Sequence, residues 1–118
     1  MKISKVRDLL EANVLCCEDK LETEVHSACG SDMMSDVLAF VKDQSILLTG
    51  LVNPQTIRTA MMMDMKAIVF VRGKKPDAMI IELAKQNSIV LLTTDYRMYT
   101  ACGLLYTAGL YTEGGDKV

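Results

Sequence analysis

The sequence predicts a three-layer α/β/α domain around a mainly parallel sheet of four to five strands, built from successive βα units. Apolar runs at residues 46–49, 68–71 and 90–93 each begin 22 residues after the previous run. The runs are β-branched and aliphatic without polar alternation, which is typical of strands buried on both faces of a parallel sheet. Polar turn residues and then a helix-length segment follow each run. Parallel neighbours require such a crossover connection.

Composition indicates a single globular domain. The chain has 118 residues, of which 50% are hydrophobic and 24% are charged. A net charge of -2 gives no general attraction to nucleic acid or to an anionic membrane, so neither is expected as a partner. No apolar run approaches the ~20 residues of a transmembrane helix, and charges interrupt the N-terminal residues, unlike a signal peptide. We expect a cytoplasmic protein whose four cysteines stay reduced.

The first part of the chain predicts two helices and two strands. Apolar residues at helical spacing predict an amphipathic helix over residues 3–11, and residues 14–17 predict a first strand. A short second strand is expected within residues 24–31. Ser31 or Asp32 can cap the next helix, which is expected to close at residues 42–44. One face of that helix should be apolar, through Met33, Val37, Leu38 and Val41.

A helix is expected after each of the three periodic strands. Asn53 and Pro54 begin the first of these helices, because Asn is a favoured N-cap and Pro at the first helical position costs no hydrogen bond. This helix should run to residue 64 or 65. The second follows a loop at residues 72–77 and should stop at Asn87.

The last helix completes the predicted domain. Thr94 or Asp95 is expected to cap it, and Gly109 to end it. The elements together predict one α/β domain over residues 1–111, followed by a mobile tail at residues 112–118.

The loops after the three periodic strands supply the candidate ligand-binding residues. In a parallel sheet these loops open at one edge, beyond the carboxyl ends of the strands, where ligands bind in open α/β folds. Helix N-termini at that edge favour anions, so we predict a small anionic metabolite, either a nucleotide or a phosphate compound. The alternative is that these residues are ordinary helix caps and solvated cations. The candidates are Thr49, Gly50, Asn53, Gln55, Arg72, Gly73, Lys74, Thr94 and Asp95.

Other motifs point away from cofactor chemistry and catalysis. The chain contains neither the glycine-rich loop of nucleoside triphosphatases nor the dinucleotide fingerprint. His26 is the single histidine and has no recognisable nucleophile partner. The four cysteines lack the spacing of a zinc or iron–sulfur site. We therefore expect no catalytic residues, no metal and no cofactor.

A run of methionines predicts an additional contact surface. Met61, Met62 and Met63, with Met65 nearby, cover more than one face of the helix expected at residues 54–65. Core filling is one interpretation. A homodimer interface is the other, because contiguous exposed apolar surface usually marks an interface.

Several segments resemble the stand-alone DRTGG-domain proteins of anaerobic bacteria. The resemblance covers about residues 5–111, and its segments are residues 32–38, 48–55, 69–74, 103–106 and 108–110. The Asp-Arg-Thr-Gly-Gly string that names the family is absent from this chain. No role tied to that string therefore carries over.

The resemblance implies an α/β domain like the N-terminal domain of HPr kinase/phosphorylase, without the kinase active site. Similar domains accompany phosphotransacetylases and, together with CBS domains, regulated pyrophosphatases, where they serve assembly and regulation, often as dimers. Stand-alone members are often encoded near iron-only hydrogenase subunits. We therefore expect a non-catalytic, ligand-sensing regulatory domain. The alternative is an assembly subunit of a redox (hydrogenase-type) or phosphotransfer complex, with a larger enzyme as its partner and no ligand.

Overall fold

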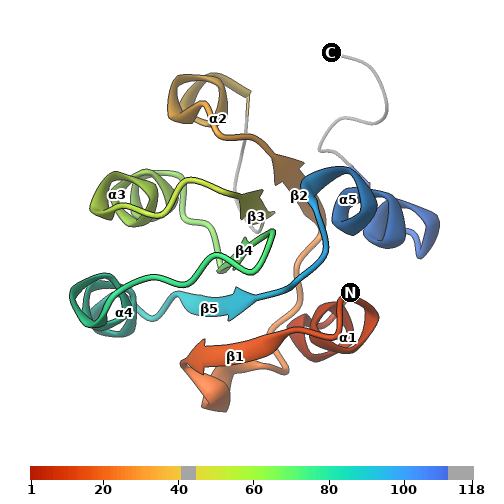
Figure 1. Ribbon diagram of the computed structural model, residues 1–118, viewed down its shortest axis with the longest axis horizontal. Helices are drawn as coiled ribbons and strands as arrows, with labels where there is room; N and C mark the ends of the chain where they lie inside the picture. The colour runs from red at the N-terminus through yellow and green to blue at the C-terminus, as the bar shows by residue number, and fades with distance from the viewer. Residues whose placement is uncertain (41–44, 112–118) are drawn as a thin grey trace.

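The protein folds into one five-stranded sheet with helices on both faces (Figure 1). The computed structural model describes residues 1–40 and 45–111. The elements follow the chain in the order α1 (Ile3–Leu9), β1 (Asn13–Cys16), η1 (Glu18–Lys20), β2 (Ser27–Gly30), α2 (Met34–Phe40), β3 (Ser45–Thr49), α3 (Pro54–Met62), β4 (Ala67–Phe70), α4 (Ala78–Gln86), β5 (Val90–Thr93) and α5 (Met98–Thr107).

The sheet confirms the predicted mainly parallel architecture. Its strand order is β1-β5-β4-β3-β2, with β2, β3, β4 and β5 mutually parallel. Only β1 runs antiparallel, alongside β5. Because β1 is reversed, the turn between α1 and β1 reaches the same edge of the sheet as the loop after β5. All the loops that follow β2, β3, β4 and β5 also open there.

The two faces of the sheet are covered by different helices. Helices α1 and α5 pack on one face, and α2, α3 and α4 pack on the other (Figure 1). Alternate residues of each central strand enter the two cores, so that every residue of β3, β4 and β5 is buried. This burial on both faces explains why the three runs lack polar alternation.

Helix starts were predicted correctly where a cap directly precedes the helix. The Asn53 side chain accepts a hydrogen bond from the Thr56 N–H at 3.2 Å, with Pro54 at the first helical position. Asp77 caps α4 in the same way, through the Ile80 N–H, and Asn87 lies at its C-terminus as predicted. Helix α3 ends at Met62, earlier than expected.

The predicted cap of α5 was wrong. The helix begins at Met98, and Arg97 is its N-cap residue without a side-chain capping bond. Thr94 is too far upstream, and its hydroxyl is used elsewhere: it donates to the Leu10 carbonyl at 2.7 Å. Threonine is a favoured capping residue. Here, however, the tertiary structure brings the Leu10 carbonyl next to Thr94, and the hydroxyl binds that carbonyl instead.

The predicted apolar face of α2 was also wrong in part. Val37 is buried as expected, but Met33 precedes the helix and is exposed, and Leu38 is exposed as well. Met34 takes the inward position instead, one turn before Val37. The remaining predicted member, Val41, lies outside the described residues, as do the helix end expected at 42–44 and the tail at 112–118.

No helix formed by residues 1–40 and 45–111 has the length and apolar character needed to span a bilayer.

The central strand β4 should be the most sensitive part of the core. Ile68 is fully buried in it, among the side chains of α2, α3 and α4. We expect Ile68→Ala to lower the free energy of unfolding by about 2–5 kcal/mol, because it removes apolar burial and leaves a cavity. Met62→Ala, at an exposed position, should change it by less than about 0.5 kcal/mol. Urea denaturation of both variants measures this, and equal costs would contradict the assigned core.

Candidate ligand site at the carboxyl edge of the sheet

The loops after β4 and β5 are joined by backbone hydrogen bonds at the carboxyl edge. The Arg72 N–H donates to the Tyr96 carbonyl and the Gly73 N–H donates to the Thr94 carbonyl, both at 2.8 Å. The Val71 N–H reaches back to the Thr49 carbonyl at the end of β3. The predicted convergence of three loops on one edge is therefore present.

Arg72 lies against Gly50 in the first loop. Arg72 and Gly73 both have positive φ, of 60° and 67°, a conformation that suits glycine and is unusual for arginine. This turn brings the guanidinium over the Gly50 backbone: a Cβ added at Gly50 would lie 2.5 Å from Nη2 of Arg72. Within residues 1–40 and 45–111, no carboxylate forms an ion pair with this guanidinium.

Asp32, for which the sequence predicted only a helix-capping role, belongs to the same edge. One of its carboxylate oxygens accepts the Thr49 hydroxyl at 2.9 Å and the Gly50 N–H at 2.7 Å. Two of the predicted ligand donors are thus occupied by a carboxylate of the chain itself. The sequence contained a signal for this position of Asp32. The residue follows β2, and the loop after a strand parallel to β3 lies at the same edge as the loop after β3.

The predicted residues of α3 have different roles. Asn53 uses its side-chain oxygen to cap the helix, and Gln55 in the first turn is exposed. Neither touches the Arg72 side chain in any interaction found among the described residues.

Thr94 has a structural role at this edge. It is buried, its hydroxyl donates to the Leu10 carbonyl, and its oxygen accepts the Tyr96 N–H at 3.3 Å. The bond from Thr94 to Leu10 ties the loop after β5 to the turn that follows α1. Lys74 is exposed, and its carbonyl accepts the Thr93 hydroxyl at 2.7 Å.

Asp95 lines an acidic hollow beside the hydrogen bond between Thr94 and Leu10. The hollow has a volume of about 340 Å³ and is formed by Leu10, Glu11, Thr94, Asp95 and Tyr96. The Tyr96 hydroxyl donates to Glu11 at 2.7 Å, and this hydrogen bond raises the pKa of Tyr96. With two carboxylates around it, the hollow disfavours an anion. The cationic part of the edge, at Arg72 and Lys74, adjoins this hollow: a Cβ added at Gly73, between the two cations, would lie 3.2 Å from Oδ1 of Asp95.

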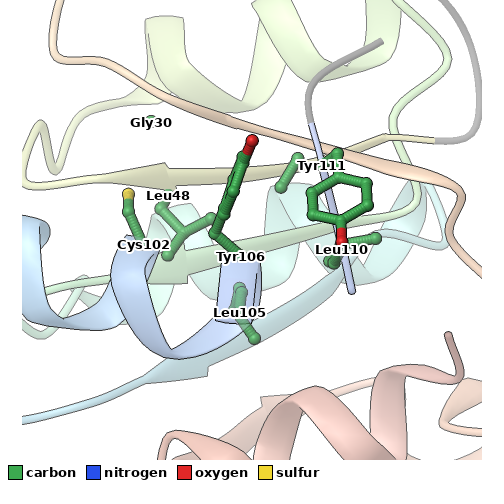
Figure 2. A pocket seen from close by; sticks show the side chains of 8 residues that line it. Gly30, Leu48, Cys102, Leu105, Tyr106, Leu110 and Tyr111 are labelled. Atoms are coloured by element: carbon green, nitrogen blue, oxygen red, sulfur yellow. The ribbon is translucent and has the colours of Figure 1, made fainter. Parts of the chain in front are cut away.

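A smaller apolar cleft lies between β2 and α5 (Figure 2). Its volume is about 90 Å³, below the ~150 Å³ of a cavity that holds benzene. The rings of Tyr106 and Tyr111 meet edge to face at its side, 4.7 Å apart. A Cβ on Gly30 would approach Cys102 Sγ to 2.7 Å, so glycine makes room for this sulfur. The cleft is too small for a nucleotide base.

Burial favours the protonated form of three thiols, those of Cys16, Cys29 and Cys102. Burial raises the pKa of Cys16 to about 11, and its Sγ donates to the Ile89 carbonyl at 3.3 Å. Burial also raises the pKa values of Cys29 and Cys102. His26 is exposed and directly precedes β2, at the amino end of that strand. In the described part of the chain, no group of three His, Cys, Asp or Glu side chains could hold a metal ion.

Alkylation should report the protonation of Cys16. We expect iodoacetamide to react slowly with this thiol at about pH 8 and faster as the pH approaches about 11, because only the thiolate reacts. The native thiol holds its proton more tightly than an ordinary thiol of pKa 9.0, so its contribution to stability is complete below about pH 9 and is lost between about pH 9 and 11. Peptide-resolved mass spectrometry, with Cys16→Ser as the control, measures the rate. Rapid alkylation of the folded protein at about pH 8 would contradict the assignment.

The fold is similar to that of a known regulatory region. The crystal structure of the CBS and DRTGG domains of the regulatory region of Clostridium perfringens pyrophosphatase, complexed with the activator diadenosine tetraphosphate, matches with a TM-score of 0.72 and 20% sequence identity. The match covers 98% of this chain and 50% of that one, so this chain spans about half the length of its structural relative. At this identity the similarity shows the shared fold. A comparison with curated proteins gave no match.

Sequence comparison with family models agrees with the fold. The model described as "DRTGG domain" matches residues 5–108. That range includes all the elements from β1 to α5 and most of α1. This chain therefore belongs to the DRTGG domain family.

Proposed function

We propose that this chain is a ligand-sensing regulatory domain that binds a small phosphate-bearing molecule at the cationic part of the carboxyl edge. Membership of the DRTGG family and the likeness to a regulatory region that binds a nucleotide activator support a regulatory role. That region also contains CBS domains, and this chain matches half of it. The comparison therefore supports a nucleotide as the first probe, and the position of the site rests on this chain's own geometry.

The observation that carries the proposal is the Arg72 guanidinium at the edge. It is exposed, lies over Gly50 and makes no ion pair with a carboxylate among residues 1–40 and 45–111. A guanidinium binds phosphate oxygens in a bidentate manner. Lys74, two residues further along the same loop, supplies a second exposed cation. Asp32 occupies the Thr49 and Gly50 donors, so the ligand would bind on the Arg72 and Lys74 side of the edge.

The contacts of the edge support binding rather than catalysis. The hydroxyls of Thr49, Thr93 and Thr94 are all buried and all donate to groups of the protein. A buried hydroxyl that is already donating is poorly placed to attack a bound substrate. We therefore place the role of this domain in sensing. Its four free cysteines support a reducing, cytoplasmic environment.

A thermal-shift assay with ATP and inorganic pyrophosphate tests the site. A ligand at 100 times its dissociation constant stabilises the folded protein by about 2.7 kcal/mol, so we expect a clear rise in melting temperature. Arg72→Ala should abolish the rise, because it removes the bidentate cation. Arg58→Ala, which removes an exposed arginine of α3, is the matched control and should retain it. Equal shifts in the two variants would place the ligand elsewhere, and no shift with either probe would remove the support for sensing.

A second candidate function is an assembly subunit of a redox (hydrogenase-type) or phosphotransfer complex. The observation that favours it is the exposure of methionines on the layer formed by α2, α3 and α4. Met62 is 74% exposed and Met79 is 72% exposed. Flexible thioether side chains adapt to the surface of a partner protein. This layer would then dock on a larger enzyme.

Charge insertion distinguishes the second candidate from the first. If the methionine layer docks on an enzyme, the chain purified from its native source should carry that enzyme, and the double variant Met62→Glu, Met79→Glu should lose it. Gln86→Glu adds a charge at an exposed position of α4 and should keep the complex. Retention of the enzyme by the double variant would contradict docking through this layer.

A further inference from the structure

The acidic hollow at the carboxyl edge has no part in the function proposed above. Its volume of about 340 Å³ lies within the range of ~300–1,000 Å³ that is usual for small-molecule sites. The apolar cleft between β2 and α5, at about 90 Å³, does not reach that range. The hollow therefore has room for part of a ligand whose phosphates lie at the cations beside it.

The hollow offers a ligand hydrogen-bond acceptors. The hydroxyls of Thr94 and Tyr96 already donate to groups of the protein. The carboxylates of Glu11 and Asp95 can only accept when they are ionised. Asp95 is exposed, and no side chain of residues 1–40 and 45–111 forms an ion pair with it. Such a hollow suits the hydroxyl groups of a ligand and repels its phosphates.

Short contacts connect the hollow with the cationic loop that follows β4. The Arg72 N–H donates to the carbonyl of Tyr96, which lines the hollow, at 2.8 Å. The next residue, Gly73, donates its N–H to the Thr94 carbonyl at the same distance. A Cβ at Gly73 would lie 3.2 Å from Oδ1 of Asp95, so glycine leaves room for this carboxylate. The hollow and the cations are thus two parts of one surface.

The order of the strands gives the separation between these two parts. The hollow lies between the end of β5 and the start of β1, whereas the Arg72 guanidinium lies over Gly50, which follows β3. In the order β1-β5-β4-β3-β2, the two positions are about two strand spacings apart, or roughly 10 Å. A single phosphate attached directly to a sugar is too short to contact both. A di- or triphosphate chain is long enough.

We propose that the acidic hollow binds the ribose hydroxyls of a nucleoside di- or triphosphate whose phosphates lie at Arg72 and Lys74. This inference rests on the function proposed above and adds the part of the ligand that the cations do not recognise. An Asp or Glu side chain accepts a hydrogen bond from a ribose hydroxyl in dinucleotide-binding folds, and Asp95 and Glu11 are placed to do so here. Because these carboxylates repel phosphate, they also fix the direction in which the ligand lies.

Isothermal titration calorimetry of the full chain in EDTA, with ATP, 2′,3′-dideoxy-ATP and tripolyphosphate, tests this subsite. ATP should bind about tenfold more tightly than its dideoxy analogue, which lacks both hydroxyls and so loses hydrogen bonds to charged groups. Asp95→Ala should weaken ATP binding about tenfold for the same reason. It should leave tripolyphosphate bound at least as tightly as before, because it removes a repulsive charge. Glu82→Gln removes an exposed carboxylate of α4 and should leave the preference for ATP unchanged.

The possible outcomes separate the ribose subsite from the phosphate site on which it rests. If Arg72→Ala abolishes binding of ATP and tripolyphosphate, but ATP and its dideoxy analogue bind equally well to the wild-type chain, the phosphate site stands and the ribose subsite is overturned. An unchanged preference for ATP in Asp95→Ala would also overturn it. So would a preference that appears only when Mg²⁺ replaces EDTA, because the carboxylates would then hold the metal ion. Failure of all three compounds to bind would remove both proposals.

Discussion

The structure depends on the parallel pairing of β3, β4 and β5, whose residues are all buried. A parallel sheet of this kind has to be covered on both faces, and each crossover places a helix on one of them. Three helices therefore cover one face, while α1 and α5 cover the other. The same pairing forces the loops after the strands to one edge. The position of the candidate site therefore follows from the parallel pairing of the strands that form the core.

The carboxyl edge of the sheet carries an exposed arginine, which attracts anions, beside carboxylates, which repel them. Arg72 projects from a turn of two positive-φ residues onto Gly50, while Asp32 takes the backbone N–H of that same glycine. Glu11 and Asp95 make the neighbouring hollow acidic. A ligand with a phosphate group would be confined to a small part of the edge by these carboxylates. In the proposed sensing role, such confinement would add specificity to affinity.

Three glycines of this chain are explained by contacts or backbone angles within the folded structure. Gly30 and Gly50 leave room for the side chains of Cys102 and Arg72, and Gly73 occupies a left-handed turn. Each of these is explained by the folded chain itself. A Cβ added at Gly103 would meet no atom of residues 1–40 and 45–111 within 4 Å.

The sequence by itself determined the fold class, the parallel strands, the cap at Asn53, the start of α4 after the loop at residues 72–77 and the edge at which the loops meet. These features depend on local pattern: periodic apolar runs, a capping residue directly before its helix and the geometry of βα units. Only the tertiary structure decided that Thr94 binds Leu10 instead of capping α5, that Asp32 fills the Thr49 and Gly50 donors, and that Met34 rather than Met33 turns inward. The physical reason is that a polar side chain bonds to the nearest available partner, and partners from segments distant in sequence become neighbours only when the chain has folded.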